Sequence, residues 1–333
     1  MGLDKHVDSF RGRRILVLAD LVADEFVYGR IERVSREAPV LILRHEQVDL
    51  RLGGGANAVH NIKALGGIPL PLGALGRDDY GARVLALLRS KGINTSRTFS
   101  LRGYVTPVKT RILAGGAHST KQQVVRIDHA SAIPDVRGAE ARVQRALRAF
   151  RGQVDGVLVS DYGLGLLTPA VVRAAIRFAK RRRIPVTVDS RHGLLALHGM
   201  TAVTPNEPEV EEALGITIGH DRRRLEQAGR LLLQRLGARA VLVTRGSDGM
   251  ALFEPGAPTL HIPIYGGDQV ADVTGAGDTV IATFTLALAS GASASDAARL
   301  ANYAGGLVVM KRGTATISRA ELKGALASDA TGA

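Results

Sequence analysis

Short apolar runs alternate with longer amphipathic stretches through most of the chain. A short run of branched apolar residues that ends in a turn predicts a buried strand, and an amphipathic stretch predicts a helix. Regular alternation of the two predicts an α/β protein whose mostly parallel sheet carries helices on both faces. The predicted strands are 15–18, 157–159, 186–188 and 239–243, and the predicted helices are 57–65, 168–182, 221–236, about 275–290 and 293–311.

Two stretches, about residues 26–50 and 104–128, break this alternation because they read as extended strands with no helices between them. A small β-sheet inserted into the main α/β body is the simplest interpretation. Such an appendage can close over a site and exclude water, so we expect it to act as a lid. The last residues, 328–333, are expected to form a frayed tail.

Composition and charge narrow the range of functions. The 333 residues include no cysteine, which excludes disulfides, thiolate-bound metals and thiol nucleophiles. The net charge of +13 fits either an anionic small substrate or a nucleic acid. The basic runs 180–183 and 222–224 fall within predicted helices, where a solvated face explains them. Because aromatic residues make up 4% of the chain and tryptophan is absent, a base-stacking surface is disfavoured and we expect no nucleic-acid partner.

Neither a membrane segment nor a secretion signal is expected. The richest apolar stretch, 280–289, is shorter than the roughly 18 residues that span a bilayer. The first residues, Met1 to Lys5, lack the basic and then apolar run of a secretion signal. We therefore expect a cytoplasmic protein with no membrane partner.

The strongest chemical signal is the segment 272–279, which reads DVTGAGDT and precedes a long apolar helix. Because Gly275 and Gly277 have no Cβ, backbone N–H groups there can point at an anion, and the helix N-terminus adds about half a positive charge. With Ala276 between them, they predict a phosphate-binding cradle. Asp278 would repel a resting phosphate but can deprotonate an attacking hydroxyl. Helix capping by Asp278 is the alternative, and the spacing alone does not decide between the two roles.

A second glycine-rich segment, Gly53 to Asn57, lets the backbone approach a ligand closely, and Asn57 offers both a donor and an acceptor. Formally, Gly53, Gly55 and Ala58 fit the dinucleotide-binding fingerprint, with Asp78 about 20 residues further on. The context argues against that interpretation. The segment does not follow the predicted first strand, and Asp78 lies in a loop before a helix.

Two further pairs of polar residues have both a chemical and a structural interpretation. Asn206 and Glu209 open a predicted helix three residues apart, so they share a face and can hold a hydrated Mg²⁺. The alternative is a capping box with Asn206 as the cap. Asp20 and Asp24 follow the first strand, where they can hold sugar hydroxyls or merely serve a turn.

Other short segments complete a pattern: Tyr28-Gly29, residues 35–40 (SREAPV), Gln122-Gln123 with Arg126 and Asp128, Ser160-Asp161-Tyr162, and Thr204-Pro205-Asn206. Together with the two glycine-rich segments, and in this order, they resemble the PfkB (ribokinase-like) family of sugar kinases over nearly the whole chain. Within that family the similarity is greatest to the D-glycero-β-D-manno-heptose-7-phosphate kinases of the ADP-heptose pathway. The segment 272–279 is the most specific part of the resemblance.

The resemblance implies one kinase domain over residues 1–333, a ribokinase-like fold with a β-sheet lid through which the chain forms a homodimer, and ATP with Mg²⁺ as cofactors. It implies that Asp278 is the catalytic base and that Gly275, Ala276 and Gly277 form the anion hole. For the nucleotide, it implies that Asn206 and Glu209 position Mg·ATP, with the metal held through water, and that Thr244, Gly246 and Asn302 line the nucleotide site. For the sugar, it implies contacts from Asp24, Gly54, Gly55 and Asn57. It also implies a candidate K⁺ site at Asp272 and Thr274.

The best-matching substrate is heptose 7-phosphate, phosphorylated at the anomeric oxygen to the 1,7-bisphosphate. Candidate cations for its phosphate are Lys109, Arg111, Arg126 and Arg191. The heptose kinases usually follow a strand with Asp-Pro-Lys-Gly, whereas this chain reads DSRHG from position 189 and places Arg191 there. Bifunctional relatives add a nucleotidyltransferase domain, and we expect only the kinase half here.

Three alternatives remain open. The chain can be a PfkB kinase for another substrate, such as ribose, fructose 1-phosphate or a nucleoside. It can be a non-catalytic protein that binds a sugar or a nucleic acid, as the net charge suggests. A dehydrogenase is the third.

Overall fold

The computed structural model describes residues 2–116, 120–266 and 270–331. Its main body is built on an eight-stranded sheet with the order β14-β13-β12-β11-β10-β9-β1-β4. Neighbours run parallel from β12 to β4, and β13 and β14 are antiparallel at one edge. The strands are β1 (Arg14–Ala19), β4 (Ile68–Leu72), β9 (Gly156–Asp161), β10 (Val186–Ser190), β11 (Ala202–Val203), β12 (Ala240–Thr244), β13 (Met250–Phe253) and β14 (Leu260–Ile262).

Helices cover both faces of this sheet, because successive side chains of a strand point to opposite faces and both sets in β1 are apolar. Leu16 and Leu18 point into one core, which α4 to α7 cover, whereas Ile15 and Val17 point into the other, which α1, α2, α8, α9 and α10 cover. The helices are α1 (Leu3–Asp8), α2 (Gly55–Ala64), α3 (Asp79–Ser90), α4 (Val136–Ala149), α5 (Pro169–Arg182), α6 (Glu207–Leu214), α7 (Arg222–Leu236), α8 (Ala276–Ala289), α9 (Ala294–Val309) and α10 (Arg319–Thr331). The predicted α/β class is confirmed.

Local sequence signals fix where several helices begin and end. In α7, the side chain of Asp221 accepts hydrogen bonds from the N–H groups of Arg223 and Arg224, and Gly237 ends the helix in the left-handed conformation. Buried Leu225 and Leu232 lie on the face that packs on the sheet. The charged positions between them face solvent, as their periodicity predicts.

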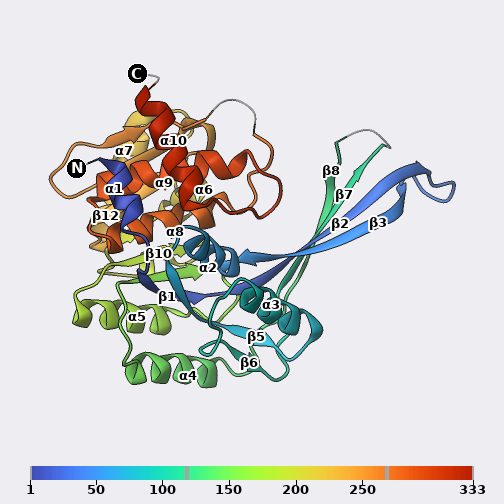
Figure 1. Cartoon of the computed structure of the whole chain (residues 1–333), viewed down its shortest axis with the longest axis horizontal. Coiled ribbons are helices and arrows are strands. Elements are labelled where there is room, and N and C mark those ends of the chain that lie inside the picture. Colours follow the sequence, from blue (N-terminus) through green and yellow to red (C-terminus); the bar gives the residue numbers. More distant parts are fainter. Residues whose placement is uncertain (1, 117–119, 267–269, 332–333) are drawn as a thin grey trace.

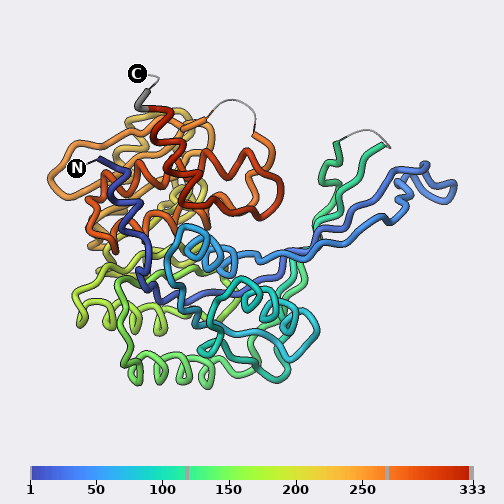
Figure 2. The backbone as a smooth tube through the Cα atoms, in the orientation of Figure 1, coloured from blue at the N-terminus to red at the C-terminus, as the bar shows by residue number. Residues whose placement is uncertain are grey.

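A second, four-stranded sheet with the order β3-β2-β7-β8 extends away from the body (Figure 1). Its strands are β2 (Leu21–Val34), β3 (Leu41–Gly54), β7 (Val108–Gly115) and β8 (Gln122–His129). The tube in Figure 2 shows that both strand pairs leave the body side by side and separate toward their tips. Two short strands, β5 (Ala74–Gly76) and β6 (Phe99–Leu101), pair in parallel near the base of this small sheet.

The C-terminal residues differ from the expected frayed tail, because α10 continues through residues 328–331. Leu322 is fully buried, and Lys323 forms an ion pair with Asp8 of α1, so the helix is anchored to the body. A helix fixed at its first turns propagates at low cost. Residues 332 and 333 lie outside the described part. Within the described ranges, no helix combines the length and apolarity needed to cross a membrane.

Candidate active site

Helix α8 begins without a side-chain cap. The residue before it, Gly275, has φ +79°, the left-handed conformation that favours glycine. A Cβ on Gly275 would lie 2.4 Å from Nδ2 of Asn57, whereas a Cβ on Gly277 would meet nothing within 4 Å. Since the first N–H groups of a helix have no acceptor within the helix, this open first turn has the properties of an anion cradle.

The carboxylate of Asp278 is held by two other elements instead of capping its own helix. Nδ2 of Asn57 donates to Oδ2 at 3.0 Å, and the hydroxyl of Tyr162 donates to Oδ1 at 2.8 Å. Burial raises the pKa of Asp278 to about 7, although both hydrogen bonds oppose the rise, and the charge of Asp24 adds to it. A carboxyl group with a pKa near 7 is suited to accepting a proton at neutral pH.

Asn57 is itself fixed by a buried chain of hydrogen bonds. Nδ2 of Asn61 donates to the backbone oxygen of Asn57 at 3.0 Å, and Oδ1 of Asn61 accepts from the hydroxyl of Thr279 at 3.0 Å. The side chain of Asn57 is fully buried and contacts Asp278 and the carbonyl of Gly275. The structure therefore places Asn57 beside the candidate base, while its expected contact with a sugar stays a prediction.

A cavity of about 370 Å³ opens beside the first turn of α8. Its wall includes three of the five residues expected at Mg·ATP and two residues of the cradle, namely Thr244, Gly246, Asn302, Ala276 and Gly277, whereas Asn206 and Glu209 do not line it. Most other described wall positions are apolar or glycine, among them Met250, Ile264, Val280 and Val309. A mostly apolar pocket with a few polar groups beside a phosphate cradle has the chemistry expected of a nucleotide site.

Helix α6 begins with a complete capping box. Oδ1 of Asn206 accepts from the N–H of Glu209 at 2.8 Å, and Oε2 of Glu209 accepts from the N–H of Asn206 at 2.9 Å. This is the structural alternative to metal binding that the spacing left open. Burial raises the pKa of Glu209, while its bonds with Asn206 and the charge of Arg191 act in the opposite direction.

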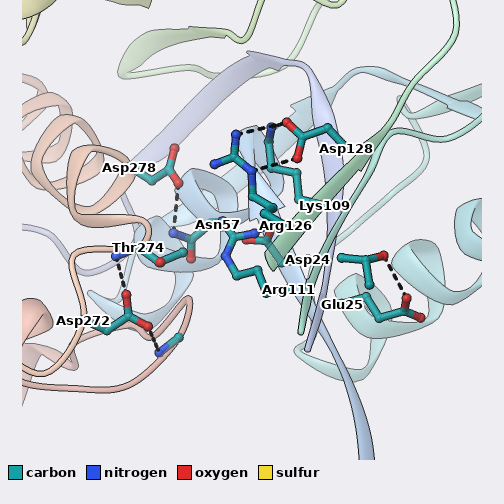
Figure 3. A network of polar contacts seen from close by, with 12 residues as sticks. Asp24, Glu25, Asn57, Lys109, Arg111, Arg126, Asp128, Asp272, Thr274 and Asp278 are labelled. Atoms are coloured by element: carbon teal, nitrogen blue, oxygen red, sulfur yellow. Dashed lines mark hydrogen bonds and ion pairs between the residues drawn. The ribbon is translucent and has the colours of Figure 1, made fainter. Parts of the chain in front are cut away.

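One face of the small sheet brings three cations and two carboxylates together near the candidate base (Figure 3). The register places Lys109 beside Asp24 and opposite Asp128, and Arg111 opposite Arg126. Nη1 of Arg111 lies 3.1 Å from Asp24, while Nζ of Lys109 and Nε of Arg126 lie 3.0 and 2.8 Å from Asp128. Burial raises the pKa of Asp24, although the three cations oppose the rise. Three of the four predicted phosphate-binding cations therefore converge.

Arg191, which follows β10, does not belong to this cluster on the small sheet, although its charge lowers the pKa of Asp278. It is exposed, and its guanidinium stands 4.3 Å from the ring centre of Tyr162. Tyr162 carries the direct contact to Asp278, yet its position in the sequence does not predict that contact. The available signal was its place just after Asp161, the acid that ends β9.

Tight packing explains the glycines at the end of β3. A Cβ on Gly55 would lie 2.4 Å from Cβ of Ala19, and one on Gly53 would lie 2.6 Å from the carboxyl carbon of Asp24. Gly54 has φ +51°, and a Cβ there would lie 2.8 Å from Val22. Gly54 and Gly55 therefore have a packing role that does not depend on a sugar.

Asp272 anchors the loop that leads into the cradle. Its Oδ1 accepts from the N–H of Thr274 at 2.9 Å, and its Oδ2 accepts from the N–H of Gly313 at 2.9 Å. Burial disfavours its ionised form, but these hydrogen bonds outweigh burial and lower the pKa of Asp272. The carboxylate is therefore ionised, which suits a nearby cation.

A second cavity, of about 780 Å³, lies between the small sheet and this loop. Its described wall includes Asp272, Arg111 and the Gln122-Gln123 pair of the family resemblance. Lys121 and Arg312 also line it and were not predicted as site residues. The cavity is thus basic and large enough for a sugar phosphate, and Asp272 and Arg111 connect it to the loop before the cradle and to the charged face of the small sheet.

Comparison with known proteins agrees with this geometry. Residues 21–321 match the family model described as "pfkB family carbohydrate kinase". The fold resembles the Arabidopsis thaliana ribokinase complexed with ribose and ATP (TM-score 0.72, 21% identity, 95% of this chain and 99% of that one). It also resembles the Escherichia coli phosphofructokinase-2 in complex with potassium (TM-score 0.73, 19% identity, 96% and 99%). The molecule is a carbohydrate kinase, a phosphotransferase with a ribokinase-like fold.

Among curated proteins, the chain is similar to several that carry the same name. The Geobacter metallireducens "Bifunctional protein HldE" is 40% identical over 327 residues, which are 97% of this chain and 65% of that protein. The protein of the same name from Caulobacter vibrioides is 39% identical, again over 97% of this chain and 65% of the relative. The chain thus spans about two thirds of the length of these relatives. It belongs to the pfkB family of carbohydrate kinases.

Proposed function

We propose that this kinase phosphorylates a sugar that already carries a phosphate, with D-glycero-β-D-manno-heptose 7-phosphate as substrate and the 1,7-bisphosphate as product. The observation that carries the proposal is the convergence of Lys109, Arg111 and Arg126 near Asp278 (Figure 3), where Arg111 also lines the basic cavity. The three cations pair with only two carboxylates, Asp24 and Asp128, so the cluster keeps an excess positive charge that suits a phosphate better than an uncharged sugar. The similarity to proteins named HldE supports a heptose over ribose, fructose 1-phosphate or a nucleoside.

The chemistry follows from the placement of Asp278 and the cradle. Oδ1 of Asp278 takes the proton of the acceptor hydroxyl, the freed oxygen forms a bond to the γ-phosphorus, and the bond from that phosphorus to the ADP oxygen breaks. The N–H groups near Gly275 and Gly277 offset the charge that develops on the phosphoryl oxygens. Positioning and electrostatics provide most of the rate increase in such a reaction.

The residues of the candidate site are suited to bind two cations, Mg²⁺ and K⁺. Mg²⁺ keeps several waters and needs few protein oxygens, so the second carboxylate oxygen of Glu209, which the capping box leaves over, can hold it through water. When bound, Mg²⁺ neutralises charge on the phosphate oxygens. K⁺ fits at the ionised carboxylate of Asp272 next to Thr274.

ATP consumption tests the proposal, measured with a panel of free and phosphorylated sugars that includes heptose 7-phosphate. We expect heptose 7-phosphate to give the highest kcat/KM. Replacing Arg126 by Gln is expected to raise the KM of the phosphorylated sugar about tenfold or more, since charge-assisted hydrogen bonds are lost, and to leave the KM of ATP unchanged. A preference for a free sugar would contradict the proposal.

A homodimer through the small sheet is a second proposal, which a different face of that sheet supports. Opposite the charged face, Val48, Val125 and Ile127 are 43%, 45% and 55% exposed. The register places Val48 and Val125 in line with Val27 and Ile112, so the apolar positions are contiguous across the four strands. Contiguous apolar surface of this kind marks protein interfaces. Light scattering should give a dimer for the wild type and a monomer for Val125→Glu/Ile127→Glu.

A further inference from the structure

The loop that follows β9 is tied to the floor of the site. Oδ2 of Asp20 accepts hydrogen bonds from the N–H groups of Tyr162 at 2.9 Å and Leu164 at 3.2 Å. The backbone oxygen of Asp20 accepts from the N–H of Gly55 at 3.0 Å, where α2 begins. Burial and the charge of Asp161 raise the pKa of Asp20 to about 7, while the two N–H bonds oppose the rise. The start of this loop is thus fixed relative to α2 and β1.

The side chain of Tyr162 reaches from this loop to the candidate base. Its hydroxyl donates to Oδ1 of Asp278 at 2.8 Å, and Arg191 covers its ring at 4.3 Å. Burial and the charges of Asp278 and Asp189 raise the pKa of Tyr162 well above 10.0. The phenol is therefore neutral throughout the physiological range and always has a proton to donate.

The two carboxylate oxygens of Asp278 differ in how firmly they are occupied. Oδ2 is bonded to Asn57, whose side chain is fully buried and is held in turn by Asn61. Oδ1 is bonded to Tyr162, whose backbone Asp20 fixes but whose side chain is only half-buried, beneath the exposed Arg191. A sugar hydroxyl that gives its proton to Asp278 can approach Oδ1 without disturbing the buried amides.

We propose that Tyr162 is a positioning residue for Asp278, and that its hydroxyl stands where the acceptor hydroxyl of the sugar binds. Substrate binding then replaces one O–H donor on Oδ1 by another. The proposal rests on the assignment of Asp278 as the base of the proposed kinase reaction. It explains why a tyrosine, and not a cation, contacts Oδ1: a neutral hydroxyl can be exchanged for a neutral hydroxyl at little electrostatic cost.

The exchange predicts a specific pH dependence for Tyr162→Phe. Without the phenol, Oδ1 has no donor in the free enzyme, so the pKa of Asp278 rises by about one unit or more. In the sugar complex the acceptor hydroxyl supplies the missing bond. The pH dependence of kcat/KM reports the free enzyme, and that of kcat reports the complex. In Tyr162→Phe, the fall of kcat/KM toward low pH (its acidic limb) should therefore begin at a higher pH than in the wild type. The acidic limb of kcat should remain at the same pH. The other charged groups that influence Asp278 are Asp24, Asp189 and Arg191, and the substitution leaves them in place.

Tyr80→Phe is a matched control, because the hydroxyl of Tyr80 donates to Glu25 at the same distance of 2.8 Å but away from the cradle. It should leave both limbs unchanged. The direct readout is the pKa of Asp278 in the ligand-free protein, measured by carbon-13 NMR of its carboxyl group and assigned by comparison with Asp278→Asn. Tyr162→Phe should raise that pKa, and Tyr80→Phe should not.

An unchanged pKa of Asp278 in Tyr162→Phe would overturn the positioning role. Equal shifts of the kcat and kcat/KM limbs would overturn the exchange, because Tyr162 would then remain on Oδ1 in the complex. Failure of the proposed function is distinguishable from both results: wild-type protein would then show no sugar-dependent ATP turnover, while the NMR comparison would still report whether Tyr162 controls Asp278.

Discussion

The N-termini of α6 and α8 start from similar sequence patterns and are used in opposite ways. Each presents an acidic residue in its first turn, three residues after the residue that precedes the helix. In α6 the acid, Glu209, returns to cap its own helix together with Asn206. In α8 the cap position is Gly275, which has no side chain, and Asp278 turns to Asn57 and Tyr162. A helix that does not cap itself leaves its N–H groups for a ligand.

Removing the charge of Asp278 should have the largest effect. We expect Asp278→Asn to fold, to bind ATP, and to lose about 10²- to 10⁴-fold in kcat, because a general base contributes that much. ATP turnover, together with ATP binding by calorimetry, measures both quantities. Loss of less than about tenfold would mean that Asp278 is not the base.

The same variant should gain stability in a defined pH window. Burial raises the pKa of Asp278 from 3.8 to about 7, so between these values the folded state binds a proton that the unfolded state releases. Stability of the wild type therefore falls as the pH rises through this window. Asparagine does not titrate. The Tm of Asp278→Asn relative to the wild type should rise from about pH 4 to about pH 7, in thermal melts at several pH values.

Alanine at the two cradle glycines should separate packing from ligand binding. Gly275→Ala forces a side chain into the left-handed region and against Nδ2 of Asn57, so we expect a loss of at least about 1–2 kcal/mol in stability and reduced turnover. Gly277→Ala meets open space, so stability should stay within about 0.5 kcal/mol while the new methyl group obstructs the phosphate and lowers kcat. Similar thermal stabilities for the two variants would contradict the described backbone.

The smallest effects are expected at α6. Glu209→Gln preserves the capping box, since glutamine serves equally well there, but removes the charge proposed to hold Mg²⁺. Its stability should not fall, because burial already disfavours the charge of Glu209, while the Mg²⁺ concentration that gives half-maximal rate should rise severalfold. As the control, Asn206→Ala should lose about 1 kcal/mol of stability through the missing cap. An unchanged Mg²⁺ requirement in Glu209→Gln would reduce this helix start to a purely structural feature.

The fold class and the position of the cradle could be predicted from the sequence, whereas contacts between distant residues could not. Apolar periodicity gave the α/β class, and the spacing of Gly275, Gly277 and Asp278 located the cradle, because both are local properties. The contact of Tyr162 with Asp278 joins residues 116 positions apart, and local pattern carries no information about such pairs. Spacing left the roles of Asn206 and Asp278 equally open, since capping and chemistry use the same residue types at the same helix positions.

The pH dependence of kcat/KM tests most directly whether Asp278 at the open start of α8 is the base. With its pKa near 7, kcat/KM of the wild type should fall about tenfold for each pH unit below about pH 7, and the residual activity of Asp278→Asn should lack this limb. A wild-type profile that stays flat down to about pH 5, or an acidic limb that persists in Asp278→Asn, would contradict the account.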